Sequence, residues 1–297
     1  MEINKSCSKY FDYKKNRSLN IASDGCNLSE WDWLYRDYLF AIHSKGFLIF
    51  LSPDKIAASD EYETFDPYTV RQNIEKEFHK TRIKLTIELL KKVACSTTTT
   101  KRILDLGCGE GHITSVMKST IKSAEFSAMD YSITAIEYAH DHYEDIDFCV
   151  GDAYDPPYST SYFDIIVCNN LYEHVPDPLR LLGKIRRILK PGGYIIMSTP
   201  SRYRLVNLIK VIIGQPVNIN KHHVTEYSVG QVMEQLAYCG FEIEMILSRP
   251  IFKGYLQTIV RTVLQLWIKM MGSHHQLGST VFYLAKKCPE NVAERDT

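Results

Sequence analysis

The sequence predicts an α/β fold with a doubly wound sheet of seven mostly parallel strands. From about residue 100 onward, short apolar runs alternate with segments whose apolar residues recur at helical spacing, as expected for parallel strands joined by crossover helices. The first run, Ile103–Leu106, leads into three glycines at alternate positions and then a helix-like segment. A strand, a tight glycine turn and a helix N-terminus form a common ligand-binding arrangement.

Each element of this fold is placed by its local pattern. Apolar runs predict strands at Ile103–Leu106, Glu125–Met129, Ile146–Val150, Phe163–Cys168, Gly193–Ser198, Phe241–Leu247 and Val281–Ala285. Helical spacing predicts helices near Thr69–Val93, His112–Lys122, Ile133–His142, Pro178–Leu189 and Val229–Tyr238.

The N-terminal quarter has a different character. Trp31–Phe50 is dense in aromatic residues and predicts a helix that is broken at Gly46 and followed by a short apolar stretch. We expect residues 1–80 to form an N-terminal extension with a helical lid, although an extra packing layer would give the same pattern. Residues 81–288 form the main domain, with apolar insertions at about 201–227 and 250–280, and residues 289–297 form a C-terminal tail.

Composition narrows the partners and the compartment. Lys and Arg together number 35, equal to Asp and Glu, so no net field attracts nucleic acid to the chain. The eight cysteines include no C-x-x-C pair, no signal-like segment opens the chain, and no apolar run is long enough to span a membrane. These observations favour a cytoplasmic protein with free thiols.

Polar residues follow four predicted strands, where ligands of such sheets bind. Asp105, Asp130 and Asp152 end the first three strands, and Asn169 and Asn170 end the fourth. Asp130 lies about twenty residues beyond the glycine turn, the usual separation for a carboxylate that accepts from ribose hydroxyls. Asp152 suits an adenine amino group or an ordinary turn. The glycine turn alone fits nicotinamide, flavin or S-adenosylmethionine, or a close strand–helix crossing.

Five motifs in order decide among these ligands. They are ILDLGCGEGH (Ile103–His112), MDYS (Met129–Ser132), GDA (Gly151–Ala153), FDIIVCNNLYEHVPDP (Phe163–Pro178) and LKPGGYIIMSTP (Leu189–Pro200). Together they resemble the class I S-adenosylmethionine-dependent methyltransferases, especially the small-molecule group that includes ubiquinone and menaquinone methyltransferase-like enzymes. The resemblance covers roughly residues 80 to 288 and implies a Rossmann-like fold, with S-adenosylhomocysteine as the product of methyl transfer.

The resemblance assigns the cofactor contacts one position at a time. It implies that the methionine portion lies at Asp105, Gly107 and Gly109, and the ribose at Asp130 beside Tyr131. It further implies that Asp152 and Ala153 border the adenine, and that Asn169 lines the sulfonium side.

The acceptor side rests on histidines. Methyl transfer needs a base when the acceptor must lose a proton, and Glu173-His174 follows the fourth strand, so His174 is the candidate base. His174 could instead fix its loop through a local hydrogen bond. His222 and His223 precede the Val229–Tyr238 helix and are candidate substrate contacts.

Two histidines with Glu173 and His174 also raise a metal interpretation. Methyltransferases that act on RNA 3′ ends resemble this pattern, pairing E-x-x-E-H with a later histidine. Here Asn170 occupies the first position, and an amide is a poorer ligand for a hard cation than a carboxylate. We therefore assign no metal from the sequence.

Two apolar segments lie outside the motifs, Leu205–Ile213 and Tyr255–Met271. In the second, polar residues form one narrow helical stripe and leave a wide apolar face. We expect core packing ahead of an acceptor channel or a membrane-surface contact.

These observations predict a methyltransferase of small-molecule biosynthesis. Its acceptor is a small, apolar or aromatic molecule, with oxygen favoured over carbon or nitrogen. The alternatives are an RNA methyltransferase with a metal-assisted 3′-end site and a non-methylating protein that binds the same cofactor.

Overall fold

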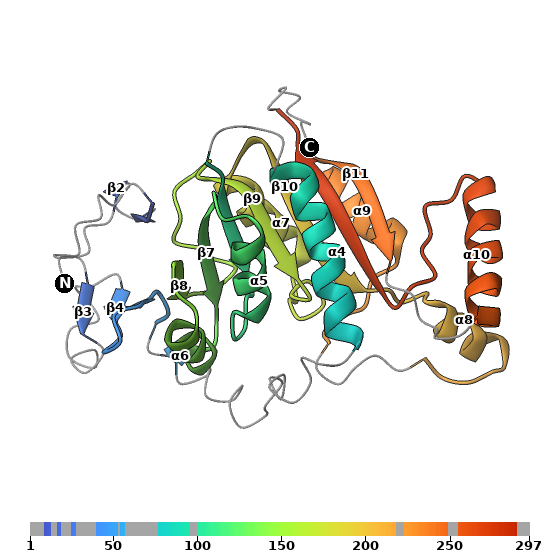
Figure 1. Cartoon of the computed structure of the whole chain (residues 1–297), viewed down its shortest axis with the longest axis horizontal. Coiled ribbons are helices and arrows are strands. Elements are labelled where there is room, and N and C mark those ends of the chain that lie inside the picture. The colour runs from blue at the N-terminus through green and yellow to red at the C-terminus, as the bar shows by residue number, and fades with distance from the viewer. Residues whose placement is uncertain are drawn as a thin grey trace.

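The computed structural model describes residues 9–12, 17–18, 25–27, 40–52, 54–56, 77–94, 100–217, 223–248 and 255–289. Its centre is a ten-stranded sheet in the order β11-β12-β10-β9-β6-β7-β8-β5-β4-β3 (Figure 1). Seven of these strands are the predicted ones, namely β6 (Arg102–Leu106), β7 (Glu125–Asp130), β8 (Ile146–Val150), β9 (Phe163–Asn169), β10 (Leu189–Pro200), β11 (Phe241–Ser248) and β12 (Thr280–Lys287). The α/β class and the mostly parallel sheet are confirmed.

The path of the chain creates a switch point at β6. From β6 the chain moves outward to β7 and β8, and then returns to β9 on the other side of β6. All these pairings are parallel, whereas β12 runs antiparallel to both β10 and β11. Because strand order reverses between β6 and β9, their carboxyl ends border the crevice where ligands of such sheets bind.

Helices cover both faces of the sheet. Figure 1 shows α4 (Glu77–Ala94) and α5 (His112–Thr120) in front of it, with α7 (Pro178–Ile188) and α9 (Val229–Tyr238) behind. Ile103 packs in one apolar cluster with Leu89 and Met117, whereas Leu104 packs in another with Leu181. The three aliphatic residues of β6, Ile103, Leu104 and Leu106, are buried because helices cover both faces of the strand.

Helix ends match their sequence signals. Ser132 accepts a hydrogen bond from Ala135 N at the start of α6 (Ile133–His142), and Asp177 accepts one from Arg180 N at the start of α7. Ser228 and Gln231 form a capping box at α9. These caps satisfy N–H groups that the first helical turn leaves unpaired, which explains why the three helices begin close to where the sequence predicts.

The N-terminal extension corrects one prediction. Phe40–Ile42 forms β4 and Leu48–Ile49 forms β5, with a turn at Gly46 (φ 95°), so the helix predicted from Trp31 to the break at Gly46 is wrong over its described part. The rest of that prediction lies outside the described residues. Strand β5 pairs in parallel with β8, and Phe50 N donates to Val150 O at 2.9 Å. Aromatic and β-branched residues favour a sheet, and the free edge of β8 supplies a partner.

Three further short strands belong to the same region. β3 (Gly25–Asn27) pairs in parallel with β4 at the outer edge of the ten-stranded sheet. β1 (Phe11–Asp12) and β2 (Arg17–Ser18) form a separate antiparallel pair. In its described part the extension therefore adds β3, β4 and β5 to the seven predicted strands of the main sheet.

Helices α8 (Leu205–Ile212) and α10 (Tyr255–Met270) correct a second prediction. They lie together at the end of the molecule opposite β3 and β4 (Figure 1). Many of their described apolar residues are exposed rather than packed in the core, with Ile212 at 82% and Met270 at 80% exposure. A sequence reports that a helix face is apolar but not what covers it. Within the described residues, no helix has both the length and the apolarity to cross a membrane.

Candidate active site

The glycine turn between β6 and α5 lies at the switch point. Gly107, Gly109 and Gly111 all adopt positive φ, at 78°, 55° and 75°, which a residue with a Cβ rarely adopts. A Cβ on Gly107 would also approach the side chain of Leu171 to 3.2 Å. Helix α5 starts without a side-chain cap. Its first N–H groups are therefore positioned to bind an anionic group, as at other helix N-termini.

Asp130 ends β7 directly beside this turn. One carboxylate oxygen accepts from Gly109 N at 2.7 Å and the other from Ser132 N at 3.0 Å. The residue is buried, and burial raises the pKa of its carboxyl, while these N–H groups oppose that rise. A carboxylate can accept about four hydrogen bonds, and the backbone N–H groups of Gly109, Ser132 and Tyr131 leave acceptor capacity for a ligand hydroxyl. Asp130 thus fits the two neighbouring hydroxyls of a ribose.

Asp105 is buried below the turn at the end of β6. Thr114 donates to its carboxylate at 2.6 Å. Burial raises the pKa of Asp105 to about 6, although Thr114 and the guanidinium of Arg82 oppose the shift. Arg82 comes from α4, and its Nη1 lies 3.5 Å from Asn170 Oδ1. A positive charge therefore stands near the uncapped end of α5, where a carboxylate would bind.

Asp152 and Tyr131 meet the N-terminal extension. Asp152 forms an ion pair with Lys55 and accepts from Tyr154 N at 2.8 Å, so it stabilises a turn as well. Tyr131 donates its hydroxyl to Lys55 O at 3.0 Å, and Ala153 packs against the core. The segment around Lys55 therefore borders the predicted adenine side.

Asn169 and Asn170 end β9 in a buried polar network. Asn169 donates to Thr86 Oγ1 of α4 at 3.1 Å, and Ser198 Oγ lies 2.9 Å from Asn169 Oδ1. Asn170 adopts positive φ (53°) and donates to Glu173 Oε1 at 2.9 Å. The Asn169 side chain thus binds the protein itself, and Asn170 connects the methionine side, at Arg82, with the histidine cluster.

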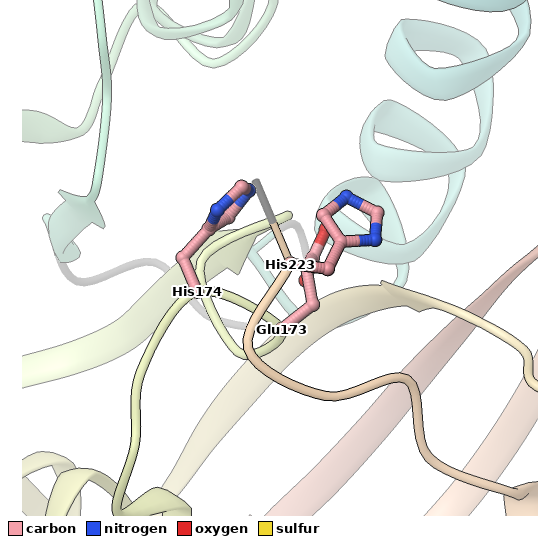
Figure 2. A group of neighbouring side chains, drawn as sticks. All are labelled: Glu173, His174 and His223. Carbon is pink, nitrogen blue, oxygen red and sulfur yellow. The ribbon is translucent and has the colours of Figure 1, made fainter. Parts of the chain in front are cut away.

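The third group is that cluster, formed by Glu173, His174 and His223 (Figure 2). One potential ligand atom from each residue lies within 4.8 Å of the others. The two imidazole rings are perpendicular, with centroids 5.1 Å apart. Backbone bonds hold the loops together, since Val224 N and Thr225 N donate to Glu173 O at 2.8 and 3.3 Å. His222, the other predicted substrate contact, lies outside the described residues.

Glu226 orients His223. Its Oε1 lies 3.1 Å from His223 Nδ1, and its Oε2 accepts from Arg204 at 2.8 Å. Burial raises the pKa of Glu226, but His223 and Arg204 outweigh burial and lower it overall. This carboxylate therefore favours the His223 tautomer that carries its proton on Nδ1.

Several site residues were absent from the sequence analysis. Arg82 reaches Asn170 from a helix distant in sequence, whereas Thr114 and Glu226 lie close in sequence to Asp105 and His223, which they contact. The H-x-x-E spacing of His223 and Glu226 was a visible signal. The position of Arg82 was not, because nothing in α4 marks the residue that reaches the sheet edge.

The arrangement fits S-adenosylmethionine. The uncapped α5 terminus and Arg82 suit its carboxylate, and Asp130 retains acceptors for the ribose hydroxyls. No phosphate is required by these groups.

Known sequences give the same result. Residues 98–240 match the sequence profile of a family described as "Methyltransferase domain". The ubiquinone biosynthesis O-methyltransferase of Thiobacillus denitrificans is 34% identical over 119 residues, which cover 38% of this chain and 50% of that protein. The malonyl-[acyl-carrier protein] O-methyltransferase of Hahella chejuensis is 31% identical over 144 residues, 48% of this chain and 51% of that protein. The chain spans about half the length of the curated relatives it matches.

Solved structures support the fold. The PH0226 protein of Pyrococcus horikoshii OT3 aligns with a TM-score of 0.52 and 19% identity, covering 77% of this chain and 98% of that one. Residues 98–240 therefore form a methyltransferase domain, and its sheet topology and ordered motifs are those of the class I S-adenosylmethionine-dependent enzymes.

Proposed function

We propose that the protein transfers a methyl group from S-adenosylmethionine to a small, apolar or aromatic acceptor, with oxygen as the favoured acceptor atom. The observation that carries the proposal is the pairing of an uncapped glycine turn with Asp130 at the switch point. Two relatives bear the names of O-methyltransferases, which supports oxygen over carbon or nitrogen.

The chain's own residues would hold the cofactor in three parts. The α5 terminus and Arg82 hold the methionine carboxylate, Asp130 holds the ribose, and Tyr131 with Ala153 borders the adenine. The ion pair between Lys55 and Asp152 lies at this last part, so Lys55 competes with the adenine amino group for that carboxylate. When bound, the sulfonium supplies an already activated methyl group, so the protein must mainly orient the acceptor and exclude water.

The acceptor side is the Glu173–His174–His223 cluster. His174 and His223 are half-buried beyond the end of β9, and Asn170 connects them to the methionine side. A neutral imidazole at His174 would accept the proton of a hydroxyl as its oxygen attacks the methyl carbon.

A transfer assay with labelled S-adenosylmethionine tests this proposal. The acceptors are a catechol with a long alkyl chain, the same catechol without the chain, a medium-chain fatty acid and an alkyl amine. We expect label on the alkylated catechol in preference to the others. Binding of S-adenosylhomocysteine without transfer to any acceptor would favour the non-methylating alternative.

We further propose that α8 and α10 bring the protein to an anionic membrane surface, from which an apolar acceptor would enter. Residues 202–225 and 249–280 contain eight Lys or Arg residues and no Asp or Glu, in a chain that is neutral overall. Their helices expose large apolar residues, including Ile212, Trp267 and Met270. Apolar faces with neighbouring positive charge are typical of helices that lie in a membrane interface.

Vesicle flotation tests the membrane proposal. Wild type should float with phosphatidylcholine vesicles that contain phosphatidylglycerol and less with phosphatidylcholine alone. The double variant Ile212→Ser, Trp267→Ser should lose flotation. Tyr238→Ser, which removes an exposed ring from α9, should retain flotation. The proposal is contradicted if the double variant floats as well as wild type does. It is also contradicted if the wild type binds single-stranded RNA and does not bind vesicles.

A further inference from the structure

The Glu173–His174–His223 cluster has a feature that proton transfer does not require. Glu173 is fully buried, and its Oε2 has no hydrogen-bond partner among the described residues, although the hydroxyl of Thr199, which also has none, lies close enough to influence the carboxyl. A buried carboxylate oxygen without a donor is costly unless a cation or another partner is bound.

The neighbouring groups are also those of a metal site. Figure 2 shows the carboxyl group of Glu173 beside the ring of His223, and the ring of His174 lies perpendicular to that of His223. Ligand atoms that bind one zinc ion at about 2.0–2.1 Å lie roughly 3.3 Å from one another. The ligand atoms of these three residues lie within 4.8 Å of one another, so small side-chain rotations would bring them to that distance.

Glu226 supplies the support that such a ligand needs. It accepts from His223 Nδ1, which leaves the lone pair on Nε2, and Arg204 anchors its other oxygen. Histidines that bind metals usually donate their second nitrogen to a carboxylate in this way, which fixes the ring and its tautomer. This arrangement does not depend on Asn170, the residue that argued against a metal in the sequence.

We propose that Glu173, His174 and His223 bind one divalent transition-metal ion of the zinc type. Two imidazoles and one carboxylate favour Zn²⁺, Co²⁺ or Fe²⁺ over Mg²⁺ or Ca²⁺, which prefer oxygen ligands. Three protein ligands leave coordination positions open, as at reactive rather than structural sites. If the methyl transfer proposed above is correct, the open positions on the metal would bind an oxygen atom of the methyl acceptor. The acceptor would then be a molecule such as a catechol. His174 would then act as a ligand rather than as a base.

Titration of the cofactor-free full chain with Co²⁺ tests the site by visible absorption, and calorimetry with Zn²⁺ measures affinity. We expect one ion per chain in wild type and loss of the absorption band in both Glu173→Gln and His223→Ala. Glu226→Gln, which changes a positioning residue, should bind about 10- to 100-fold more weakly. His274→Ala removes an exposed histidine outside the cluster and should bind as wild type does.

The result separates this inference from the proposed function. Each variant is also titrated with S-adenosylhomocysteine, and retained binding shows that its fold is intact. Metal binding without cofactor binding would contradict the methyltransferase proposal alone. The metal site would be overturned if the wild type shows no absorption band. It would also be overturned if Glu173→Gln keeps the band, or if His274→Ala loses it.

Discussion

Asp130 and Asp152 show how the surroundings of a residue separate two similar predictions. Both follow strands of the sheet, yet Asp130 is buried against the glycine turn and retains acceptors for a ligand. Asp152 pairs with Lys55 and its own turn. The sequence could place both carboxylates at the sheet edge, but not Lys55, because the ion pair joins segments about a hundred residues apart.

Asp105 gives a stability prediction with a defined sign. Its folded pKa of about 6 exceeds the usual value of about 3.9, so the folded state binds the proton more tightly than the unfolded state. The free energy of unfolding therefore falls as pH rises from about 4 to about 6, and the cost persists above that window. Asp105→Asn removes this cost and should gain up to about 3 kcal/mol relative to wild type at about pH 7, but little at about pH 4.

Urea unfolding of the cofactor-free proteins at both pH values measures this difference. Glu144→Gln, which changes an exposed carboxylate, serves as the control and should show no such trend. If the free energies of unfolding of Asp105→Asn and wild type differ by the same amount at both pH values, the raised pKa of Asp105 is refuted.

His174 gives a kinetic prediction. Whether as base or as metal ligand, it acts on the acceptor and not on the cofactor. In His174→Gln, kcat should fall by about 100-fold or more, while the affinity for S-adenosylhomocysteine stays unchanged. Steady-state kinetics and calorimetry on the same preparation check both halves. Full turnover across neutral pH would leave His174 as a loop-stabilising residue.

Among the elements, predictions succeeded where the periodicity was strong and failed where tertiary context decides. Strand β8 and helices α6 and α9 have the predicted limits, because burial on both strand faces and clear caps mark them. The aromatic run ending at Phe50 carries no such period. Leu48–Ile49 within it forms a strand because the edge of β8 is available for pairing. The local sequence pattern cannot indicate that such an edge lies nearby.

The N-terminal strands should therefore contribute to the stability of the domain. Ile49 in β5 is fully buried against β8. Ile49→Ala should lower the free energy of unfolding by about 2–4 kcal/mol, the usual cost of truncating a buried isoleucine. Ile212→Ala, at an exposed position, should change it by less than about 0.5 kcal/mol. If urea unfolding gives the two variants the same free energy of unfolding, β5 does not contribute to the stability of the domain.

Across the whole molecule, the neutral total charge hides an uneven distribution. Residues 202–225 and 249–280, around α8 and α10, contain only basic charges, so the rest of the chain is correspondingly acidic. The total charge does not reveal this asymmetry, whereas the structure brings α8 and α10 together at one end of the molecule (Figure 1). The cofactor side could be predicted from ordered motifs. The acceptor side could not, because it depends on which loops meet.

The central claim is that the glycine turn and Asp130 hold S-adenosylmethionine for methyl transfer. Calorimetric titration of S-adenosylhomocysteine into wild type, Asp130→Asn and the surface variant Glu144→Gln tests it most directly. Saturable binding by wild type and Glu144→Gln is expected, with a loss of about tenfold or more in Asp130→Asn, since the charged acceptor for the ribose hydroxyls is removed. No binding by wild type, or equal affinity in Asp130→Asn, would contradict it.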